Sequence, residues 1–266
     1  MKLPVVCILL LACLIIETQA RKKHGLIVLH GLGGGFGPAF CIIMKKGLRI
    51  NTDEVRVECP EAKCRAHTLL PPTWISKPLP SSGACVPSWF DFKLMPGLAV
   101  FSPGHPSDPT ELAAAAQLVE NIIQDMVNDG IPSENIVLTG ASQGGVITLY
   151  QAVHSKFKLG AFVPIVTWYG NLKSDGPSNY DSVNKHTPIL QINGAADPIV
   201  PAIPAGRETR KAMEAVFPNY EIKYIPFTTH STTVNPVSFK MMRNFFKENN
   251  LLSYCRSFFG CILGSR

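Results

Sequence analysis

One stretch constrains the fold of this chain more than any other: Asn135–Tyr150, which reads NIVLTGASQGGVITLY. An apolar run, Ile136–Thr139, leads into a turn with the pattern G-x-S-x-G, and residues with helical spacing follow. This pattern between a strand and a helix predicts a nucleophile elbow, a tight turn that lifts a serine hydroxyl above the C-terminal edge of a sheet. Flanking glycines allow the close backbone approach that such a turn requires. We therefore interpret Ser142 as a nucleophile; the alternative is a serine that only caps the helix.

Strands and helices alternate through the rest of the sequence. The predicted strands are Leu26–His30, Val55–Cys59, Ala161–Val166, Ile189–Asn193 and Glu221–Pro226. The predicted helices are Pro38–Lys46, Asp108–Asn128, Gly206–Phe217 and Val237–Lys247. A chain of 266 residues, 46% of them hydrophobic, is long enough to bury one sizeable core. Because this alternation favours a parallel sheet covered on both faces, we expect a single α/β domain with a mostly parallel central sheet.

The first twenty residues have a different composition. Lys2 is followed by a continuous apolar run, Leu3–Ile16, and by a short polar exit that ends at Ala20. This arrangement predicts a secretory signal peptide that is cleaved after Ala20. The alternative is a retained anchor, although the apolar run is short for a bilayer. We therefore expect a secreted protein, or alternatively one in an endomembrane lumen or lysosome.

Six cysteines remain after such a cleavage, and an oxidising compartment would allow them to pair. They are Cys41, Cys59, Cys64, Cys85, Cys255 and Cys261. Cys64 and Cys85 flank the proline-rich, irregular stretch between Pro60 and Pro87, so we expect a disulfide that closes it.

The other four cysteines divide into two pairs by position. Cys255 and Cys261 could close the tail, whereas Cys41 falls in a predicted helix and Cys59 at a strand end, where we expect buried thiols. The spacing fits no zinc site, and we expect no metal or cofactor.

The formal charge of +6 is scattered along the chain. Outside Arg21-Lys22-Lys23 the basic residues form no stripe with interleaved aromatic side chains. We therefore expect no nucleic-acid partner, and at most a transient contact with an anionic membrane surface.

A serine nucleophile needs a base and a group that orients the base, and the elbow predicts the chain order serine, acid, histidine. The histidines after Ser142 are His154, His186 and His230. His154 lies late in the predicted elbow helix and His186 precedes its strand, whereas His230 lies in a polar loop after the last strand. Asp197 directly follows the preceding strand. We predict Ser142, Asp197 and His230 as the catalytic set; the alternative for Asp197 is a turn cap.

A glycine-rich turn, His30-Gly31-Leu32-Gly33, ends the first predicted strand. It lacks the lysine and serine of a phosphate-binding loop, so a nucleotide site is disfavoured. In a hydrolase such a turn supplies a backbone N–H to an oxyanion hole. We expect the His30 side chain to hydrogen-bond the loop and to take no part in chemistry.

An aromatic cluster lies at the end of the proline-rich stretch, within Pro87–Phe92. Trp89 and Phe90 could form one wall of an acyl pocket or a minor satellite core, and the sequence leaves both alternatives open.

Several segments resemble the acyl-protein thioesterase/lysophospholipase family of α/β-hydrolases, in the order found in that family. They are LIVLHGLGG, VPSWFDF, NDGIPSENIVLTGASQGG, GAADPIVP and the pair His230-Ser231. The resemblance spans residues 25–250 and implies an α/β-hydrolase fold with Ser142, Asp197 and His230 as the triad. It also implies an oxyanion hole formed by the backbone N–H groups of Leu32 and Gln143, with Trp89 near the acyl channel. Because both donors are main-chain groups, we expect changes of the Gln143 side chain to cost less activity than any triad change.

The chain departs from this family in three respects. Gly34 stands where members commonly carry aspartate, the region between Cys59 and Trp89 is longer, and members are typically cytosolic. We therefore expect a signal peptide at 1–20, an α/β-hydrolase domain at 21–250 and a C-terminal tail at 251–266.

The expected activity is hydrolysis of long-chain acyl thioesters or esters through an acyl-Ser142 intermediate. The expected partners are substrates: an acylated small molecule, a lysophospholipid or an S-acylated protein. One alternative is a secreted carboxylesterase for short-chain or other lipid esters. The alternative from another class is an inactive, lipid-binding hydrolase fold, which a complete triad disfavours.

Overall fold

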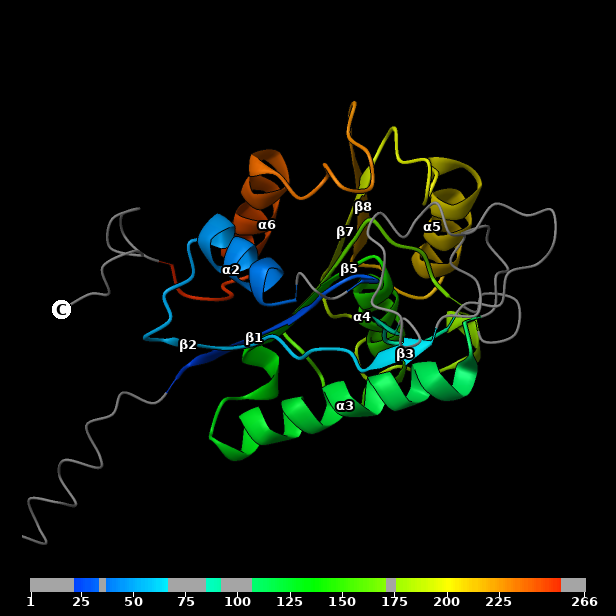
Figure 1. The fold of residues 1–266 in the computed structure, drawn as a ribbon. Coiled ribbons are helices and arrows are strands. Elements are labelled where there is room, and N and C mark those ends of the chain that lie inside the picture. Colours follow the sequence, from blue (N-terminus) through cyan, green and yellow to red (C-terminus); the bar gives the residue numbers. More distant parts are fainter. Residues whose placement is uncertain (1–21, 34–36, 67–84, 92–106, 171–175, 255–266) are drawn as a thin grey trace, which may run out of the picture.

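Parallel strands in the order β2-β1-β5-β6-β7-β8 form a six-stranded central sheet in the computed structural model (Figure 1). The structure describes residues 22–33, 37–66, 85–91, 107–170 and 176–254. The strands are β1 (His24–Leu29), β2 (Val55–Glu58), β5 (Ile136–Ala141), β6 (Ala161–Ile165), β7 (Ile189–Gly194) and β8 (Tyr220–Ile225). Every neighbouring pair in this sheet is parallel, which confirms the predicted architecture.

Helices cover both faces of the sheet (Figure 1). One face carries α2 (Gly37–Leu48) and α6 (Pro236–Glu248), and the other carries α3 (Pro109–Asn128), α4 (Gln143–His154) and α5 (Arg207–Glu214). Alternate residues of β1 show how one strand serves both layers, because successive side chains of a strand point to opposite faces. Ile27 and Leu29 pack in the cluster with α3 and α4, and Leu26 and Val28 pack in the cluster with α2 and α6.

The starts of α3 and α6 follow local capping chemistry. The Asp108 side chain accepts hydrogen bonds from the backbone N–H groups of Thr110 and Glu111, at 2.9 and 3.1 Å. Asn235 and Ser238 form a reciprocal capping box at the start of α6. Such caps each stabilise a helix by about 1 kcal/mol, and Asp108 explains why α3 begins where the sequence predicts.

A two-stranded antiparallel ribbon lies within the stretch that we expected to be irregular. It pairs β3 (Cys64–Ala66) with β4 (Cys85–Pro87), and residues 67–84 between them lie outside the described residues. Strands of three residues are too short to show an alternating pattern, so no sequence pattern predicts the ribbon.

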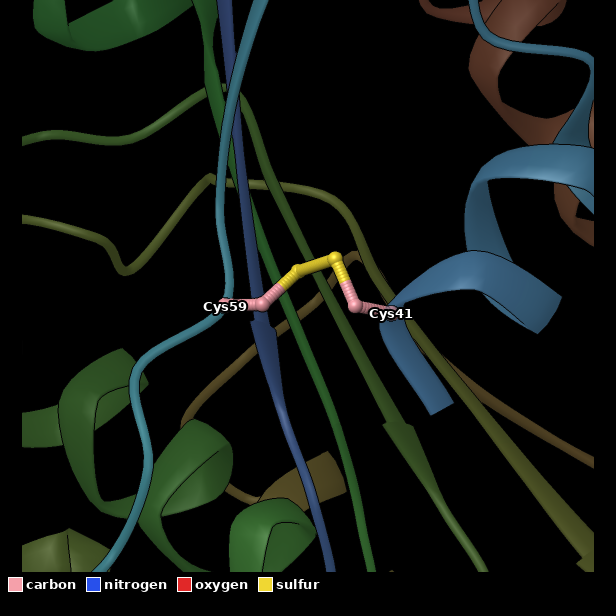
Figure 2. The surroundings of a disulfide bond; sticks show 2 residues. All are labelled: Cys41 and Cys59. Carbon is pink, nitrogen blue, oxygen red and sulfur yellow. A yellow bond between two sulfur atoms is a disulfide. The ribbon is translucent and has the colours of Figure 1, made fainter. Parts of the chain in front are cut away.

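A disulfide joins Cys41 to Cys59 (Figure 2), so the prediction of two free thiols is wrong. Cys41 lies in the first half of α2, and Cys59 directly follows β2. Because β1 and β2 are parallel, β2 ends at the edge of the sheet from which α2 starts back. The two cysteines therefore meet, with their Cα atoms 5.9 Å apart.

Cys64 is also disulfide-bonded. The side chain of Cys85 and the residues Cys255 and Cys261 lie outside what the structure describes, so the expected pairings stay predictions. The signal peptide and residues 255–266 of the expected tail likewise lie outside the described part. The first residues of that tail are described and pack on the domain, with Leu251 and Leu252 buried in the cluster with α2 and α6. Among the described helices, none combines the length and the apolar character needed to cross a membrane.

Candidate active site

Ser142 forms the sharp turn between β5 and α4. Its backbone has φ 54° and ψ −115°, which is a strained conformation for a residue with a side chain. A Cβ on Gly140 would lie 2.3 Å from the carbonyl oxygen of Gly144, and a Cβ on Gly144 would lie 2.4 Å from that of Leu29. Both glycines are therefore required by close backbone contacts. The Ser142 side chain makes no capping hydrogen bond to α4, so the predicted elbow is confirmed and the capping alternative is wrong.

Asp197 and His230 are joined by a hydrogen bond. His230 Nδ1 lies 2.8 Å from Asp197 Oδ2. The other carboxylate oxygen of Asp197, Oδ1, accepts hydrogen bonds from the backbone N–H groups of Ile199 and Val200, at 2.8 and 3.0 Å. Asp197 is thus also a turn cap, and the cap turns Oδ2 toward the imidazole.

The serine stands at the same edge of the sheet as this pair. Ser142 follows β5, Asp197 follows β7 and His230 follows β8, so all three lie beyond the C-terminal ends of parallel strands. Within the described part of the chain, Ser142 Oγ makes no hydrogen bond to His230. The structure therefore joins acid and base directly and places the serine at the same edge of the sheet, without that third link.

The glycine-rich turn after β1 lies against the serine. A Cβ on Gly31 would be 3.2 Å from Ser142 Cβ and 3.9 Å from Ser142 Oγ. His30 shapes this turn, because its Nδ1 donates to the carbonyl oxygen of Gly31 at 2.6 Å and its Nε2 accepts from the N–H of Ala62 at 3.0 Å. These partners fix the neutral tautomer with the proton on Nδ1, and burial lowers the pKa of His30. The prediction that His30 holds the loop is confirmed.

Leu32 and Gln143 lie on the two turns that flank the serine. Leu32 directly follows Gly31, and Gln143 is the first residue of α4, where backbone N–H groups have no acceptor within the helix. The positive end of the helix dipole adds to this electropositive environment. The oxyanion role of these two N–H groups stays a prediction.

The Gln143 side chain has a function that sequence reasoning missed. It is fully buried and contacts the segment just after β4: Oε1 accepts from the N–H of Trp89 at 3.2 Å, and Nε2 donates to the carbonyl oxygen of Phe90 at 2.8 Å. The amide also hydrogen-bonds the buried Ser88 hydroxyl. The residue type at this position was visible in the sequence, but its partners lie more than fifty residues earlier in the chain.

Trp89 and Phe90 are both buried, with 3% and 0% of their surface exposed. They pack in the core cluster on the α3 and α4 side, and the Trp89 indole donates to the carbonyl oxygen of His30 at 2.7 Å. Trp89 and Ser88 also line a cleft of about 400 Å³ between the ribbon side and α3. They therefore pack in the main core of that face and not in a minor satellite core, and their binding of substrate stays a prediction.

The other two histidines lie away from the serine. His154 ends α4, with its ring stacked on Tyr150 at a centroid distance of 3.9 Å. His186 precedes β7 and therefore lies at the opposite edge of the sheet from Ser142. Of the three histidines after Ser142, only His230 lies beyond the C-terminal end of a strand, where a base is expected.

Comparison with known proteins agrees with this geometry. Residues 11–250 match the phospholipase/carboxylesterase family. Acyl-protein thioesterase 1 of Kluyveromyces lactis is 28% identical over 220 residues, which cover 80% of this chain and 86% of the relative. Acyl-protein thioesterase 1 homolog 2 of Dictyostelium discoideum is 36% identical over 191 residues, covering 70% and 76% respectively. The crystal structure of Arabidopsis thaliana SOBER1 has a TM-score of 0.69 and 25% identity, covering 85% of this chain and 99% of that chain. The chain therefore belongs to the phospholipase/carboxylesterase family and has the α/β-hydrolase fold.

Proposed function

We propose that this protein hydrolyses long-chain acyl thioesters or esters through an acyl-Ser142 intermediate. The observation that carries the proposal is the strained elbow of Ser142, which stands at the same sheet edge as the hydrogen-bonded pair Asp197 and His230. Relatives that match most of the chain are acyl-protein thioesterases, which supports this substrate class.

The geometry supports general-base activation of the serine. With its Nδ1 held by Asp197, His230 has only Nε2 left to take the proton from Ser142 Oγ. Catalytic hydrogen bonds are often long without substrate and tighten in the complex, so the missing serine–histidine bond is compatible with this step. The Asp197 carboxylate then stabilises the imidazolium that forms.

The reaction proceeds in two halves. Ser142 Oγ attacks the acyl carbonyl carbon, and negative charge develops on its oxygen near the N–H groups of Leu32 and Gln143. The bond to the thiolate or alkoxide leaving group breaks as His230 returns the proton to it. Water, deprotonated by His230, then attacks the acyl-Ser142 ester; the bond to Ser142 Oγ breaks as His230 returns the proton to Oγ, and the fatty acid leaves. This sequence requires no metal or cofactor.

The substrate we infer carries a long acyl chain on a polar body, either a lysophospholipid or an S-acylated protein. A secretory route, supported by the apolar N-terminal run and by the Cys41–Cys59 disulfide, favours extracellular lipid esters among these. A carboxylesterase for short-chain esters is the alternative substrate class.

Labelling and substrate profiling test the proposal together. The wild-type protein should react with a fluorophosphonate probe at Ser142, and the Ser142→Ala variant should not. Turnover is then compared on a palmitoyl thioester, a lysophosphatidylcholine and a p-nitrophenyl acetate. Labelling without turnover of either long-chain substrate would refute the proposed substrate class, and preference for the acetate would favour the carboxylesterase. Lipid binding without labelling would support the non-catalytic alternative.

A further inference from the structure

One short segment, Pro87–Phe90, is hydrogen-bonded to both turns that flank the nucleophile. At its start, the N–H of Gly33 donates to the carbonyl oxygen of Pro87 at 3.0 Å. The Trp89 indole then reaches the carbonyl oxygen of His30 at 2.7 Å. These two bonds fall on either side of Leu32, so the segment holds the turn that carries the Leu32 N–H.

The same segment holds the second turn through Gln143. The buried Gln143 amide uses both its oxygen and its nitrogen on the backbone of Trp89 and Phe90, at 3.2 and 2.8 Å. The Ser88 hydroxyl completes this cluster, because it donates to the carbonyl oxygen of Phe90 at 2.7 Å and lies 3.0 Å from Gln143 Nε2. Ser88, Phe90 and Gln143 are all fully buried. Moving any of these groups would leave a buried polar atom without its partner, which destabilises the folded protein. The hydrogen-bonded cluster is therefore rigid.

Within the described residues, no other segment is hydrogen-bonded to both the turn after β1 and the turn after β5. The turns also touch directly, because a Cβ on Gly31 would lie 3.2 Å from Ser142 Cβ and one on Gly144 would lie 2.7 Å from the carbonyl oxygen of His30. These contacts limit how closely the turns approach but contribute no hydrogen bond between the described turn residues. Orientation decides catalysis here, because an oxyanion donor is effective only when its N–H points at the oxygen that becomes charged.

We propose that the Gln143 side chain is a positioning residue that, through Pro87–Phe90, fixes the two oxyanion donors relative to each other. This inference rests on the proposed function and deepens it. It adds a positioning role for the Gln143 side chain to the expected role of its main-chain N–H, and the expected loss stays smaller than that of a triad change. Gln143 would then act twice, by its own N–H on the substrate and by its amide on the N–H of Leu32.

The helix offers a matched control. Gln151 lies on α4, about 12 Å further along by helix geometry, is 1% exposed, and donates to the carbonyl oxygen of Ala116 at 2.6 Å. Replacing either glutamine by leucine removes a buried amide and its hydrogen bonds to backbone. Only Gln143→Leu releases the segment that braces the two turns.

The test compares kinetics and stability of Gln143→Leu and Gln151→Leu in protein expressed from the full chain. Both should lower the unfolding temperature. Gln143→Leu alone should lower kcat by about tenfold to a hundredfold, with KM within about threefold, since complete loss of one oxyanion donor costs about a hundredfold to a thousandfold. Equal kcat in the two variants, or a loss confined to KM, would overturn the proposal.

Two further variants apply if Gln143→Leu does not fold. Ser88→Ala removes the hydroxyl that bonds to Phe90 and to the Gln143 amide, and Trp89→Phe removes the indole bond to His30 while it keeps a ring. Each should lower kcat, and the double variant should lose less than the product of the two, because both act on one geometry. Independent, multiplicative losses would count against a shared brace.

Two readouts separate this inference from the proposed function. The rate of fluorophosphonate labelling at Ser142 depends on the donors and not on the natural substrate, and it should fall in Gln143→Leu only. Hydrogen exchange of the Gly33 amide needs no chemistry at all, and it should accelerate in Gln143→Leu but not in Gln151→Leu. A wild-type protein that labels without cleaving either the palmitoyl thioester or the lysophosphatidylcholine would defeat the substrate assignment alone, whereas unchanged Gly33 exchange would defeat the proposed role of Gln143.

Discussion

His230 Nδ1 and Asp197 Oδ2, 2.8 Å apart, connect the loops that follow two neighbouring strands, β7 and β8. The loops are also joined through their backbones, because the N–H of Ala196 donates to the carbonyl oxygen of Thr228 at 3.0 Å. A Cβ on Gly194 would lie 2.4 Å from that same oxygen. Acid and base are therefore assembled before any substrate binds.

Removal of the nucleophile or the base should abolish turnover while the fold is kept. We expect Ser142→Ala and His230→Ala each to lower kcat by on the order of a millionfold, as in serine-protease triads, and the double variant to lose little more. Steady-state kinetics with circular dichroism as the control for folding checks this. Near-normal activity in His230→Ala would contradict the assignment of His230 as the base.

Asp197 should respond differently to two substitutions, because its two oxygens have different partners. Asp197→Asn keeps an oxygen for the Ile199 and Val200 N–H groups but spoils the contact with His230, so kcat should fall by roughly ten thousandfold with little change in stability. Asp197→Ala should lose similar activity and also about 1 kcal/mol of unfolding free energy through the lost cap. Denaturant unfolding of both variants measures this difference, and equal stabilities would contradict it.

The elbow and the placement of Ser142, Asp197 and His230 at one edge of the sheet could be inferred from sequence, because both depend on local signals. Gly140, Ser142 and Gly144 dictate one turn, and parallel strands bring their following residues to one edge. The Cys41–Cys59 disulfide could not be inferred, since it depends on where α2 passes β2. The brace at Gln143 was invisible for the same reason: its partners are distant in sequence, and a buried glutamine looks like any polar residue at a helix start.

His30 should make stability depend on pH. Its folded pKa is lowered by burial, whereas the unfolded side chain keeps about 6.5. The unfolded state therefore binds more protons below that pH. The contribution of neutral His30 to the free energy of unfolding is complete above about pH 6.5, and it is lost as the pH falls from there through the folded pKa.

We expect His30→Gln to flatten the dependence of unfolding free energy on pH between about 7.5 and 5. His24 has a pKa lowered in the same direction by burial, so His24→Gln serves as the comparison and removes only its own share. A slope in His30→Gln as steep as in the wild type would contradict the buried, neutral His30.

Trp89 should influence chain-length selectivity if it lines the acyl site. Each methylene that contacts a buried wall contributes up to about 0.8 kcal/mol, so Trp89→Ala should lower kcat/KM more for palmitoyl than for acetyl esters. Trp89→Phe keeps an aromatic wall but loses the hydrogen bond to His30, so it should lower kcat/KM for both substrates to the same extent. The ratio of kcat/KM for palmitoyl to acetyl esters therefore separates contact of Trp89 with the acyl chain from its role in positioning the turns. An unchanged ratio in Trp89→Ala would leave Trp89 with core packing alone.

Compartment and covalent structure can be tested together. If the predicted signal peptide is removed, protein from a secreting host should begin at or near Arg21, with Cys41 and Cys59 joined as in the structure. This bond spans 18 residues, so its loss should cost roughly 3 kcal/mol of unfolding free energy in the loop-closure account. Cys41→Ser should lose this free energy in the oxidised protein. Adding reductant should then destabilise it little further, except through the bond at Cys64, and Cys64→Ser is the control for that bond.

N-terminal sequencing and peptide mapping of unreduced protein give the remaining readouts. An intact Met1 together with freely alkylated Cys41 and Cys59 would overturn the secretory proposal and favour a cytosolic enzyme that acts on S-acylated proteins.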